Sequence, residues 1–459
     1  MTGKPMKTGA VYCGDCQNIL GNTNEFPDEC VDLVYVDPPF FSNRQHEVIW
    51  GDGYELRSFE DRWKGGIENY VAWMEPKLRE CHRVLRKNGT MYLHCDWHAN
   101  HRLRVLMDQI FGESRFVNEI VWKRSDAHSD AKQGAKHFGR IHDTILFYSK
   151  GPEYTFNTIY RPLPDTTVEK WYRHVEVATG RLYNLADLTA AKPGGDTLYE
   201  WRGKRPPKGR YWAYSKKKME ELEKAGRIEY SGSGKPYMIR YLDESKGVPF
   251  QDWWDDIGML RGITRDGERL GYPTQKPEAL MERIIEVSSN STDVVLDPMC
   301  GCGTTVAVAQ RLSRRWVGID ISPTACMLIT DRLRRAGAQN IELIGMPKTL
   351  EEIKTIQPFE FQNWVLQKLM GRVSPRKTGD MGIDGYLFDG TPIQVKQSED
   401  VGRNVIDNFE TAIKRGKKKK GIIVAFSFGK GAYEEVARAK NQDGVEIELK
   451  QVEEIIKEN

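Results

Sequence analysis

The first clear hydrophobic pattern in the chain is the run from Val31 to Val36, in which apolar side chains are nearly continuous. Such a run is typical of a strand inside a parallel sheet, where both faces are covered. The run ends at the segment Asp37-Pro38-Pro39-Phe40. Because ligands of open α/β sheets bind at the carboxyl ends of parallel strands, we expect this segment to lie at a binding edge.

A second pattern, far along the chain, predicts a strand, a glycine turn and a helix in succession. Val294 to Leu296 is the strand, and the segment after it is Asp297-Pro298-Met299-Cys300-Gly301-Cys302-Gly303-Thr304-Thr305. The glycines let a ligand approach the backbone, and a helix over 304–312 points its amino terminus at the loop. Arg315 to Ile319 is the next expected strand and ends at Asp320. We therefore predict a βαβ unit.

Further elements are expected outside these two motifs. Three runs predict strands that finish the first half of the sheet: Thr90–Leu93, Asn118–Lys123 and His142–Tyr148. Near the end of the chain the expected elements are a helix from Glu360 through Met370, a strand to Phe388, an Asp389-Gly390 turn and a strand over Ile393–Gln397. An Asp-Gly turn between two strands is a strong signal for a hairpin.

The chemistry of the segment from Asp37 to Phe40 predicts an amino nucleobase as its substrate. The two prolines fix φ and remove amide donors, so the segment offers acceptors. The Asp37 carboxylate and the Pro38 carbonyl can accept both hydrogens of an exocyclic amino group, while Phe40 offers a flat face for stacking. The alternative is a strand followed by a proline-rich turn with a surface aromatic.

The glycine loop predicts S-adenosylmethionine as a cofactor. Asp320 lies about twenty residues past the glycines, where dinucleotide-type folds hold ribose hydroxyls. The loop lacks the full GxGxxG pattern, and Asp297-Pro298 follows the strand directly. We expect this arrangement to suit an adenosyl ligand that bears a sulfonium better than a pyrophosphate.

Length and composition favour a multidomain enzyme. The chain has 459 residues, which suggests two to three domains. Its net charge of +3 is only mildly basic, so a nucleic-acid surface has to be local. We find no charged leader, no apolar stretch long enough to cross a bilayer and no disulfide framework. We therefore expect a cytoplasmic protein with reduced cysteines and no membrane association.

Two clusters of potential zinc ligands are present, and we expect neither to bind zinc. Cys13-Gly14-Asp15-Cys16 lacks a second pair of cysteines. The second cluster, His94-Cys95-Asp96-Trp97-His98 with His101, follows a strand and opens a helix. Structural zinc sites need four converging ligands, and neither pattern supplies them.

Together the two main motifs resemble the β class of DNA amino-methyltransferases, in which the catalytic motif precedes the cofactor loop. Asp37 to Phe40 is similar to the catalytic motif, and Asp297 to Thr305 is similar to the cofactor loop. Tyr272-Pro273-Thr274-Gln275-Lys276-Pro277 is similar to the segment that closes over the methionine end of the cofactor. Gly14-Asp15-Cys16 is similar to the first cofactor contact.

This resemblance implies a set of site residues. Those expected to be catalytic are Asp37, Pro38, Pro39 and Phe40. Those expected to contact the cofactor are Asp15, Cys16, Asp37, Lys276, Asp297, Pro298, Met299, Gly301, Gly303, Thr304, Thr305 and Asp320. Met299 and Cys302 depart from the common residues of the family, which are Phe and Ser, and should alter the packing of the adenine ring.

The implied reaction is methylation of an exocyclic amino group in DNA, for which the target nucleotide rotates out of the duplex. Asp37 favours N6 of adenine over N4 of cytosine, because the cytosine members that resemble this loop more often begin it with Ser. Methylation of ring carbon 5 needs a nucleophile in a Pro-Cys setting, whereas Cys300 lies in the cofactor loop. A nucleic-acid-binding protein with an inactive core is the rival interpretation.

The stretch 151–244 differs in composition and resembles the inserted target-recognition region of the family. The segment from Trp201 to Trp212 interleaves cations with aromatics, and Lys216-Lys217-Lys218 follows it at an expected helix start. Such cations contact phosphates, and arginine can also contact guanine edges. The alternative is a solvated basic face over a small core, because cations that contact phosphates and solvated surface cations look alike in sequence.

The residues after Met346-Pro347 predict a separate unit with hydrolytic chemistry. Because side chains alternate between the two faces of a strand, Gln394 and Lys396 lie on one face, and the hairpin can bring them beside Asp384. An acid, an amide oxygen and a lysine around one point can hold Mg²⁺ and activate a water against a phosphodiester. The alternative is a hairpin with solvated polar side chains.

This second pattern resembles the Mrr-type restriction endonucleases of the PD-(D/E)xK superfamily. The resemblance implies catalytic roles for Asp384, Gln394 and Lys396, of which Asp384 and Gln394 also ligate the metal, and an accessory metal-ligand role for Glu360. Gln394 replaces the carboxylate of most members and should bind Mg²⁺ more weakly. The run from Lys414 to Lys420 could contact phosphates, although such runs are more often solvated helix ends. A module that only binds DNA is the alternative.

We therefore predict an α/β fold: a Rossmann-like methyltransferase sheet with an inserted target-recognition region, plus a small carboxy-terminal α/β domain of the PD-(D/E)xK nuclease type. The predicted ranges are 1–150 and 245–346 for the two halves of the core, 151–244 for the insertion and 351–459 for the nuclease-like domain. The expected activity is restriction and modification of double-stranded DNA in a prokaryotic cell, and a homodimer is left open.

Overall fold

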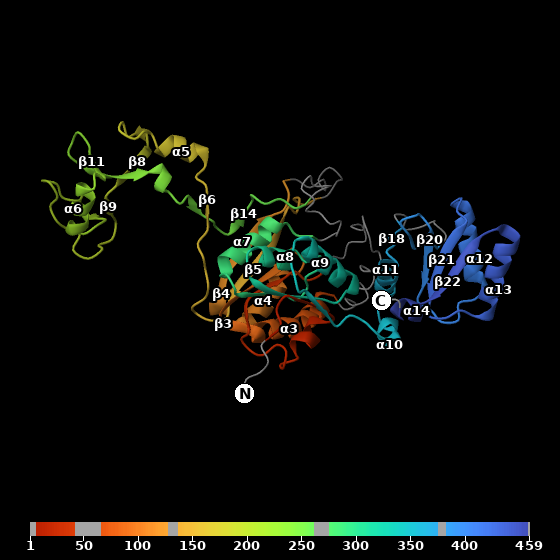
Figure 1. Ribbon diagram of the computed structural model, residues 1–459. Helices are drawn as coiled ribbons and strands as arrows, with labels where there is room; N and C mark the ends of the chain where they lie inside the picture. Colours follow the sequence, from red (N-terminus) through yellow and green to blue (C-terminus); the bar gives the residue numbers. More distant parts are fainter. Residues whose placement is uncertain (1–5, 42–65, 127–135, 261–274, 375–381, 458–459) are drawn as a thin grey trace. The chain divides into compact units, whose positions relative to one another are not determined.

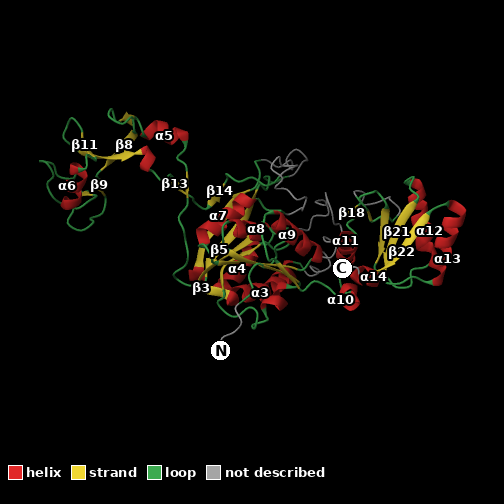
Figure 2. Ribbon diagram, in the orientation of Figure 1, coloured by secondary structure: helices red, strands yellow, loops and turns green. Residues whose placement is uncertain are grey.

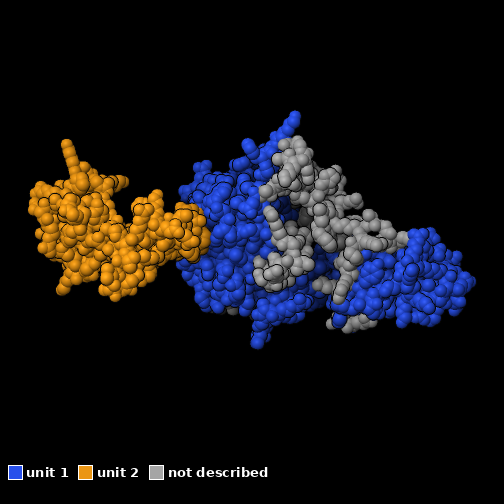
Figure 3. All heavy atoms as spheres, turned by 90° about the horizontal axis from the view of Figure 1, so that it is seen from above, with its two compact units in different colours: residues 1–157, 252–459 blue, residues 158–251 orange. Residues whose placement is uncertain are grey.

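The computed structural model describes residues 6–41, 66–126, 136–260, 275–374 and 382–457 (Figure 1). Residues 272–274 and 379–381, which belong to two of the motifs above, lie outside this part. The chain forms two compact units, residues 1–157 with 252–459 and residues 158–251 (Figure 3). The four predicted domain ranges stay predictions.

The first unit is built on a sheet with the strand order β14-β4-β5-β3-β2-β15-β16-β1-β17 among the described residues. Its strands are β1 (Ala10–Cys13), β2 (Val31–Val36), β3 (Leu85–Cys95), β4 (Phe116–Lys123), β5 (His142–Ser149), β14 (Trp253–Trp254), β15 (Val294–Asp297), β16 (Arg315–Asp320) and β17 (Glu342–Ile344). All neighbouring pairs are parallel except those of β5, which runs antiparallel to β3 and β4. This is the predicted α/β class.

Both faces of this sheet are buried, which explains the continuous apolar run in β2. Val34 and Val36 belong to one core cluster, whereas Leu33 and Tyr35 belong to the other. The helices of this part are α1 (Cys16–Leu20), α3 (Ile67–Val84), α4 (Asn100–Phe111), the 3₁₀ turn η1 (Glu113–Arg115), α7 (Glu278–Ser288), α8 (Thr304–Arg311) and α9 (Pro323–Arg335). Helices α3 and α4 cover the first face, and α7, α8 and α9 cover the second (Figure 2).

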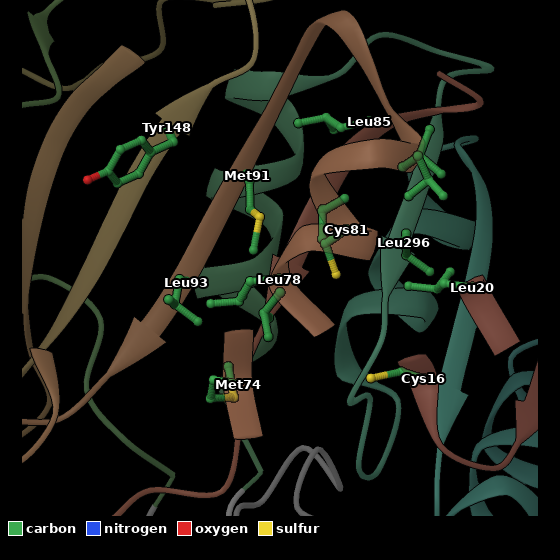
Figure 4. Close-up of a cluster of buried hydrophobic side chains, with 14 of the residues drawn as sticks. Cys16, Leu20, Met74, Leu78, Cys81, Leu85, Met91, Leu93, Tyr148 and Leu296 are labelled. Atoms are coloured by element: carbon green, nitrogen blue, oxygen red, sulfur yellow. The ribbon is translucent and has the colours of Figure 1, made fainter. Parts of the chain in front are cut away.

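The first cluster shows how a helix is held on the sheet. Met74 and Leu78 of α3 are fully buried and lie against Leu93 of β3, as Figure 4 shows. The two helix residues are four positions apart and therefore share one face of α3. A fully buried side chain of this size contributes about 1.5–3 kcal/mol relative to an exposed one.

The two motifs of the sequence lie on neighbouring strands. Strands β2 and β15 pair in parallel, with Leu33 opposite Val295. Asp32 supports the pairing, because its buried carboxylate accepts a hydrogen bond from Val294 N at 2.8 Å and contacts Arg86 Nη1 at 2.6 Å. The predicted adjacency of the two strand ends is therefore confirmed. The expected βαβ unit is also present as β15, α8 and β16.

The carboxy-terminal part of the first unit forms a second sheet with the order β18-β19-β20-β21-β22. Its elements are α10 (Leu350–Lys354), α11 (Pro358–Lys368), β18 (Arg372–Val373), β19 (Gly385–Tyr386), β20 (Pro392–Lys396), α12 (Arg403–Arg415), β21 (Lys420–Ala425), α13 (Lys430–Arg438), the π-helical turn η4 (Ala439–Asp443), β22 (Glu446–Gln451) and α14 (Val452–Lys457). Strands β19 and β20 pair antiparallel, so the predicted hairpin is confirmed. The predicted strand to Phe388 is wrong at its end, because Leu387 N already bonds to Thr391 O in the turn.

The second unit has a small core of its own. Its elements are β6 (Tyr160–Arg161), α5 (Asp165–Trp171), β7 (His174–Val175), β8 (Leu182–Asp187), β9 (Thr189–Ala190), β10 (Tyr211–Trp212), α6 (Lys216–Lys224), β11 (Ile228–Tyr230), β12 (Pro236–Tyr241), η3 (Leu242–Glu244) and β13 (Val248–Pro249). Trp201 and Trp212 are buried and pack with Leu188 and Met219. These two aromatics of the basic segment therefore build the core, while Lys204 and Lys208 are exposed.

Candidate active sites

Five neighbouring parallel strands of the large sheet end at one edge, and an aspartate stands at or just after each end. The strands in order are β1, β16, β15, β2 and β3, and the aspartates are Asp15, Asp320, Asp297, Asp37 and Asp96. Parallel strands bring their carboxyl ends to the same edge. The edge is therefore rich in hydrogen-bond acceptors, which suits a ligand that carries hydroxyl or amino donors.

Asp37 at the end of β2 has two oxygens, of which one has a partner among the described residues. Its Oδ2 lies 2.5 Å from Lys276 Nζ, and both side chains are largely buried, at 18% and 11% exposure. Its Oδ1 is buried and accepts no hydrogen bond from any described residue. Lys276 Nζ also lies 5.2 Å from the centre of the Phe40 ring. The segment therefore presents a buried acceptor oxygen next to a lysine that also lies near the Phe40 ring. The predicted catalytic roles of this segment stay predictions.

The rest of this segment is rigid backbone. Pro38 is buried, and Pro39 and Phe40 are partly buried. Because neither proline has an amide hydrogen, the segment exposes no donor at these two positions. Its chemistry is therefore that of an acceptor array.

Asp297 at the end of β15 is buried, at 2% exposure. Burial raises the pKa of its carboxyl group to about 7, although hydrogen bonds from Thr305 and from Met299 N act in the opposite direction, and the charge of Asp37 adds to the rise. The other predicted cofactor residues of this segment lie in the loop or at the start of α8: Pro298, Gly301, Gly303 and Thr304.

Asp320 at the end of β16 holds the glycine loop. Its Oδ2 accepts from Gly301 N at 2.7 Å, and its Oδ1 accepts from Ser322 N at 2.9 Å. Burial raises the pKa of this carboxyl group to about 6 against the effect of these two bonds, and the charge of Glu360 adds to the rise. The acid expected to hold ribose hydroxyls thus lies beside the turn expected to face the adenosyl group.

The helix start after the loop depends on glycine and arginine contacts. Gly303 has φ +76°, and a Cβ at this position would lie 2.8 Å from Ile329. Arg332 Nη1 donates to Cys302 O at 3.2 Å, while its Nη2 contacts Glu278 at 2.7 Å. Sequence reasoning did not identify Arg332. It lies on α9, and no local motif links it to the loop.

Asp15 and Cys16 serve the local structure of α1. Asp15 Oδ1 accepts from Gln17 N at 2.9 Å and caps the helix, while Asp15 Oδ2 lies 3.1 Å from the buried Lys77 Nζ. Cys16 is buried, and burial raises the pKa of its thiol to about 12. Their expected contact with a cofactor stays a prediction.

The histidines of the considered zinc cluster have other partners. His94 lies between Tyr35 and Asp143, and His98 Nδ1 lies 2.5 Å from Asp96 Oδ2. Sequence reasoning weighed His94 only as a metal ligand and missed its partners. The available signal was Asp143, a charged residue at the start of an otherwise apolar strand.

A second candidate site surrounds the hairpin of β19 and β20. Ile393 and Val395 point into a core cluster, so the alternating residues Gln394 and Lys396 lie on the opposite face. Asp384 flanks Gln394, because Asp384 N donates to Ile393 O at 2.8 Å and Asp384 Oδ2 accepts from Val395 N at 2.7 Å. The fold thus brings Asp384 and Gln394 together.

The side-chain oxygen of Gln394 has no partner in the described part of the chain. The side chain is 3% exposed, and its Oε1 accepts no hydrogen bond from the described residues. Gly382, with φ +95°, leaves room for it, since a Cβ there would lie 2.2 Å from Gln394 Nε2. Leaving a buried acceptor unpaired costs about 1–3 kcal/mol. Amide and carboxylate oxygens such as those of Gln394 and Asp384 are suitable ligands for Mg²⁺.

Glu360 of α11 has a partner outside this pair. Its Oε2 accepts a hydrogen bond from Ser322 Oγ at 2.7 Å. Its expected role as an accessory metal ligand stays a prediction.

In the described parts of the chain one further group of acids has the spacing of metal ligands, namely Asp407, Glu410 and Glu435. Arg438 forms ion pairs with all three, so its guanidinium balances their charge.

Comparison with known proteins identifies the class. The model of the family described as DNA methylase matches residues 31–331, and a model described as restriction endonuclease matches residues 353–458. The chain belongs to the DNA methylase family, with a restriction endonuclease domain fused after it. Both resemblances inferred from sequence are confirmed.

The relatives include methyltransferases of restriction-modification systems. The Type II methyltransferase M.EcaI of Enterobacter cloacae is 32% identical over 65% of this chain and 64% of its own length. The StyLTI Mod subunit, a Type III restriction-modification enzyme of Salmonella typhimurium, is 27% identical over 90% and 64%. The DNA adenine methyltransferase YhdJ of Escherichia coli is 28% identical over 72% and 85%. The chain thus spans somewhat less than two thirds of the first two relatives.

Two solved structures are also similar. The Thermus thermophilus protein TTHA0409, complexed with S-adenosyl-L-methionine, is 18% identical over 74% of this chain and 99% of that one, with a TM-score of 0.39. The PvuII DNA methyltransferase, named as cytosine-N4-specific, is 16% identical over 74% and 98%, with a TM-score of 0.37. Within the described residues, no helix has the length and apolar character needed to span a membrane.

Proposed function

We propose that this chain transfers a methyl group to an exocyclic amino group in double-stranded DNA, with N6 of adenine as the favoured atom. The observation that carries the proposal is the buried Oδ1 of Asp37, which has no hydrogen-bond partner within the described residues and which follows the strand next to the glycine loop of Gly301. An acceptor such as Asp37 Oδ1, at the edge of the sheet where the target base is proposed to bind, suits a hydrogen of an amino group. S-adenosylmethionine is the proposed cofactor.

The cofactor residues fit an adenosyl ligand by their chemistry. Asp320 offers a carboxylate to the ribose hydroxyls, and the loop of Gly301 and Gly303 lets the ligand approach the backbone. When bound, S-adenosylmethionine supplies an electrophilic methyl group on a sulfonium. Lys276 holds Asp37 from the side of Oδ2, which leaves Oδ1 for the substrate.

The catalytic segment acts on the amino nitrogen, which is a poor nucleophile because it is conjugated with the base. Hydrogen bonds from the amino group to Asp37 Oδ1 and to the Pro38 carbonyl favour a more tetrahedral nitrogen as the methyl group arrives. Such acceptors stabilise the transition state more than the ground state. Stacking on Phe40 holds the rotated base in place.

Adenine is favoured by two features. The segment begins with Asp37, and the relative YhdJ is named as a DNA adenine methyltransferase. N4 of cytosine is the alternative target, since both bases present an amino group beside a ring nitrogen. The same site chemistry serves either base.

Sequencing the DNA of cells that express the chain, with detection of modified bases, tests this proposal. We expect N6-methyladenine at one recurrent sequence, absent from cells that express Asp37→Ala. N4-methylcytosine at a recurrent sequence supports the alternative target. Unmodified DNA from cells with abundant, folded protein contradicts the proposal.

We infer that the fused domain is a Mg²⁺-dependent nuclease that cuts DNA lacking this modification. The specific observation is the buried Oε1 of Gln394, which has no hydrogen-bond partner among the described residues, next to the strand position at which Asp384 accepts from Val395 N. These two oxygens are the proposed ligands of Mg²⁺, and Lys396 on the same face is the proposed charge partner of the scissile phosphate. A domain that only binds DNA is the alternative function.

Unmethylated plasmid incubated with the purified chain and Mg²⁺ separates the two functions of this domain. We expect nicking or cleavage by the wild type, none by Lys396→Ala, and protection of plasmid that was methylated beforehand. If neither the wild type nor Lys396→Ala cleaves the plasmid and both still bind it, only the DNA-binding function remains.

A further inference from the structure

Three buried polar residues on three neighbouring strands form a chain beneath the catalytic segment. Tyr35 is on β2, His94 on β3 and Asp143 on β5, and their exposure is 1%, 0% and 3%. The Tyr35 hydroxyl lies 2.9 Å from His94 Nδ1, and His94 Nε2 lies 3.4 Å from Asp143 Oδ2. Each end of the imidazole ring is therefore held by a different strand.

The surroundings select one tautomer of His94. Burial, followed by the charges of Asp37, Asp297 and Asp143, keeps the pKa of Tyr35 well above its ordinary value, so its O–H is available as a donor to Nδ1. Nε2 then carries the hydrogen and donates it to Asp143 Oδ2. Both ring nitrogens are thus satisfied, and the ring cannot rotate without breaking a buried hydrogen bond.

Asp143 remains an acceptor in this chain. Burial raises the pKa of its carboxyl group, but the hydrogen bond from His94 and the positive charges of Arg124 and Lys276 act in the opposite direction, and the pKa lies below its ordinary value. Lys276 is the residue that holds Asp37. The positive charge of Lys276, which faces the Asp37 carboxylate, therefore also stabilises the buried carboxylate of Asp143.

His94 contacts the ring that is proposed to carry the target base. Its ring centre lies 5.6 Å from that of Phe40, with an interplanar angle of 38°, and 5.5 Å from the edge-on ring of Trp122. Strand pairing sets this packing, because Trp122 lies opposite Asp143 across β4 and β5. Phe40 therefore rests on a ring whose orientation is fixed by two hydrogen bonds and one aromatic contact.

A packing role alone does not account for this chain. Burying a carboxylate and an imidazole costs more free energy than burying apolar side chains of similar volume. Tyr35, one member of this hydrogen-bonded chain, stands two residues before Asp37 in β2, and His94 lies against Phe40. At this place a fixed orientation of the Phe40 ring matters for the chemistry. Such a device suits the positioning of a base more than the stability of the sheet.

We propose that His94, held by Tyr35 and Asp143, is a positioning residue for methyl transfer. It fixes the tilt of the Phe40 ring and so the plane of the rotated target base, which brings the amino group to Asp37 Oδ1. This inference rests on the proposed function and adds a residue that does not touch the substrate.

His94→Gln is the test variant, because glutamine can still donate to Asp143 but offers no ring to Phe40. Tyr92→Phe is the matched control: it removes a buried hydrogen bond to Ser288, at 2.7 Å, two positions earlier on the same face of β3. The readouts are kcat, KM for the cofactor, the melting temperature, and the fluorescence of 2-aminopurine at the target position of a duplex.

We expect His94→Gln to lower kcat roughly 10- to 100-fold, the effect of a small misplacement of reacting groups. The KM for the cofactor stays within about twofold, since the cofactor loop is untouched. The 2-aminopurine signal rises as stacking on Phe40 is lost. Tyr92→Phe changes the melting temperature without changing kcat or the fluorescence.

A folded His94→Gln protein with the kcat and fluorescence of the wild type overturns the inference. If this variant does not fold, Tyr35→Phe decides, because it keeps the ring and its bond to Asp143 and releases only Nδ1. A severalfold loss of kcat at unchanged cofactor KM supports positioning, and an unchanged kcat overturns it. Absence of transfer by the wild type is a different result, which contradicts the proposed function itself.

Discussion

At the scale of single residues, two of the aspartates at the sheet edge, Asp297 and Asp320, hold protons more tightly than ordinary carboxyl groups do. Burial raises the pKa of Asp297 to about 7 and that of Asp320 to about 6. Both values lie near neutral pH, so the charge of the proposed cofactor site changes over a range that is easily measured. The state of Asp320 bears most directly on cofactor affinity, because its carboxylate is the proposed acceptor for ribose hydroxyls.

Cofactor affinity should therefore fall as the pH is lowered through about 6. The ribose hydroxyls donate to the ionised form, so protonation of Asp320 competes with binding, by up to about tenfold per pH unit below the pKa. Titration calorimetry with S-adenosylhomocysteine from pH 5 to 8 measures this effect. Asp320→Asn should bind more weakly and with a flatter pH profile. A dissociation constant of the wild type that stays constant over this range contradicts the assignment.

A second prediction at this scale concerns Gln394. Replacing the buried amide by a carboxylate in Gln394→Glu adds a charged oxygen beside Asp384, so Mg²⁺ affinity should rise by roughly tenfold or more. Calorimetric titration with MgCl₂ measures the change. Gln451→Glu, which adds the same charge on β22, is the control and should leave the affinity unchanged. Equal Mg²⁺ binding by both variants and the wild type argues against a metal site at Asp384.

The sequence groups candidate site residues where they share a contiguous motif. Asp37 and Phe40 follow one strand, and Asp297 to Thr305 follow another, so spacing alone groups them. It fails where partners come from separate strands, as for His94, Tyr35 and Asp143. Their proximity depends on the order of β2, β3 and β5 in the sheet, which no local pattern specifies.

At the scale of elements, the start of α8 depends on a glycine that has no room for a side chain. Gly303→Ala combines a positive φ with a contact to Ile329, so it should lower the free energy of unfolding by about 1–3 kcal/mol and weaken cofactor binding. Gly337→Ala is the control, because it has a similar φ of +84° but no atom within 4 Å of the added Cβ. Denaturant unfolding of the two variants measures the difference. Equal losses in both would show that the contact with Ile329 contributes nothing.

Elements were predictable where the hydrophobic period was clear. Strand β2 has the predicted bounds, and α8 ends one residue before the predicted Leu312. Strand β3 extends beyond the predicted Thr90–Leu93 at both ends, because Leu85 pairs with β2 and because His94 and Cys95 pair with β5. Such pairing is tertiary and overrides local propensity.

At the scale of the whole molecule, the nearly balanced charge means that DNA contacts have to come from local groups of cations. Lys204 and Lys208 in the second unit are exposed, whereas Arg202 pairs with Glu223 and Arg210 donates to Thr189. We therefore expect these two lysines to be among the cations of the predicted recognition region that contact phosphates.

Changing both lysines to alanine should weaken DNA binding and lower the slope of log Kd against log salt by up to about 2, since each phosphate contact contributes about 0.9. Fluorescence anisotropy with duplex DNA at several salt concentrations measures the slope. The control is the pair Lys7→Ala and Lys87→Ala, at the amino edge of the large sheet, which should leave the slope unchanged. If the two double variants behave alike, the second unit does not supply these contacts.

The central claim is that two adjacent strand ends, at Asp37 and at the loop of Gly301, form one site for methyl transfer to DNA. Single-turnover transfer of a labelled methyl group from S-adenosylmethionine to duplex DNA, with the product digested to nucleosides, tests it most directly. We predict N6-methyldeoxyadenosine as the labelled product of the wild type, and a loss of at least about a hundredfold in the single-turnover rate at saturating cofactor for Asp37→Ala. Label on a ring carbon, or equal rates for wild type and Asp37→Ala, contradicts the claim.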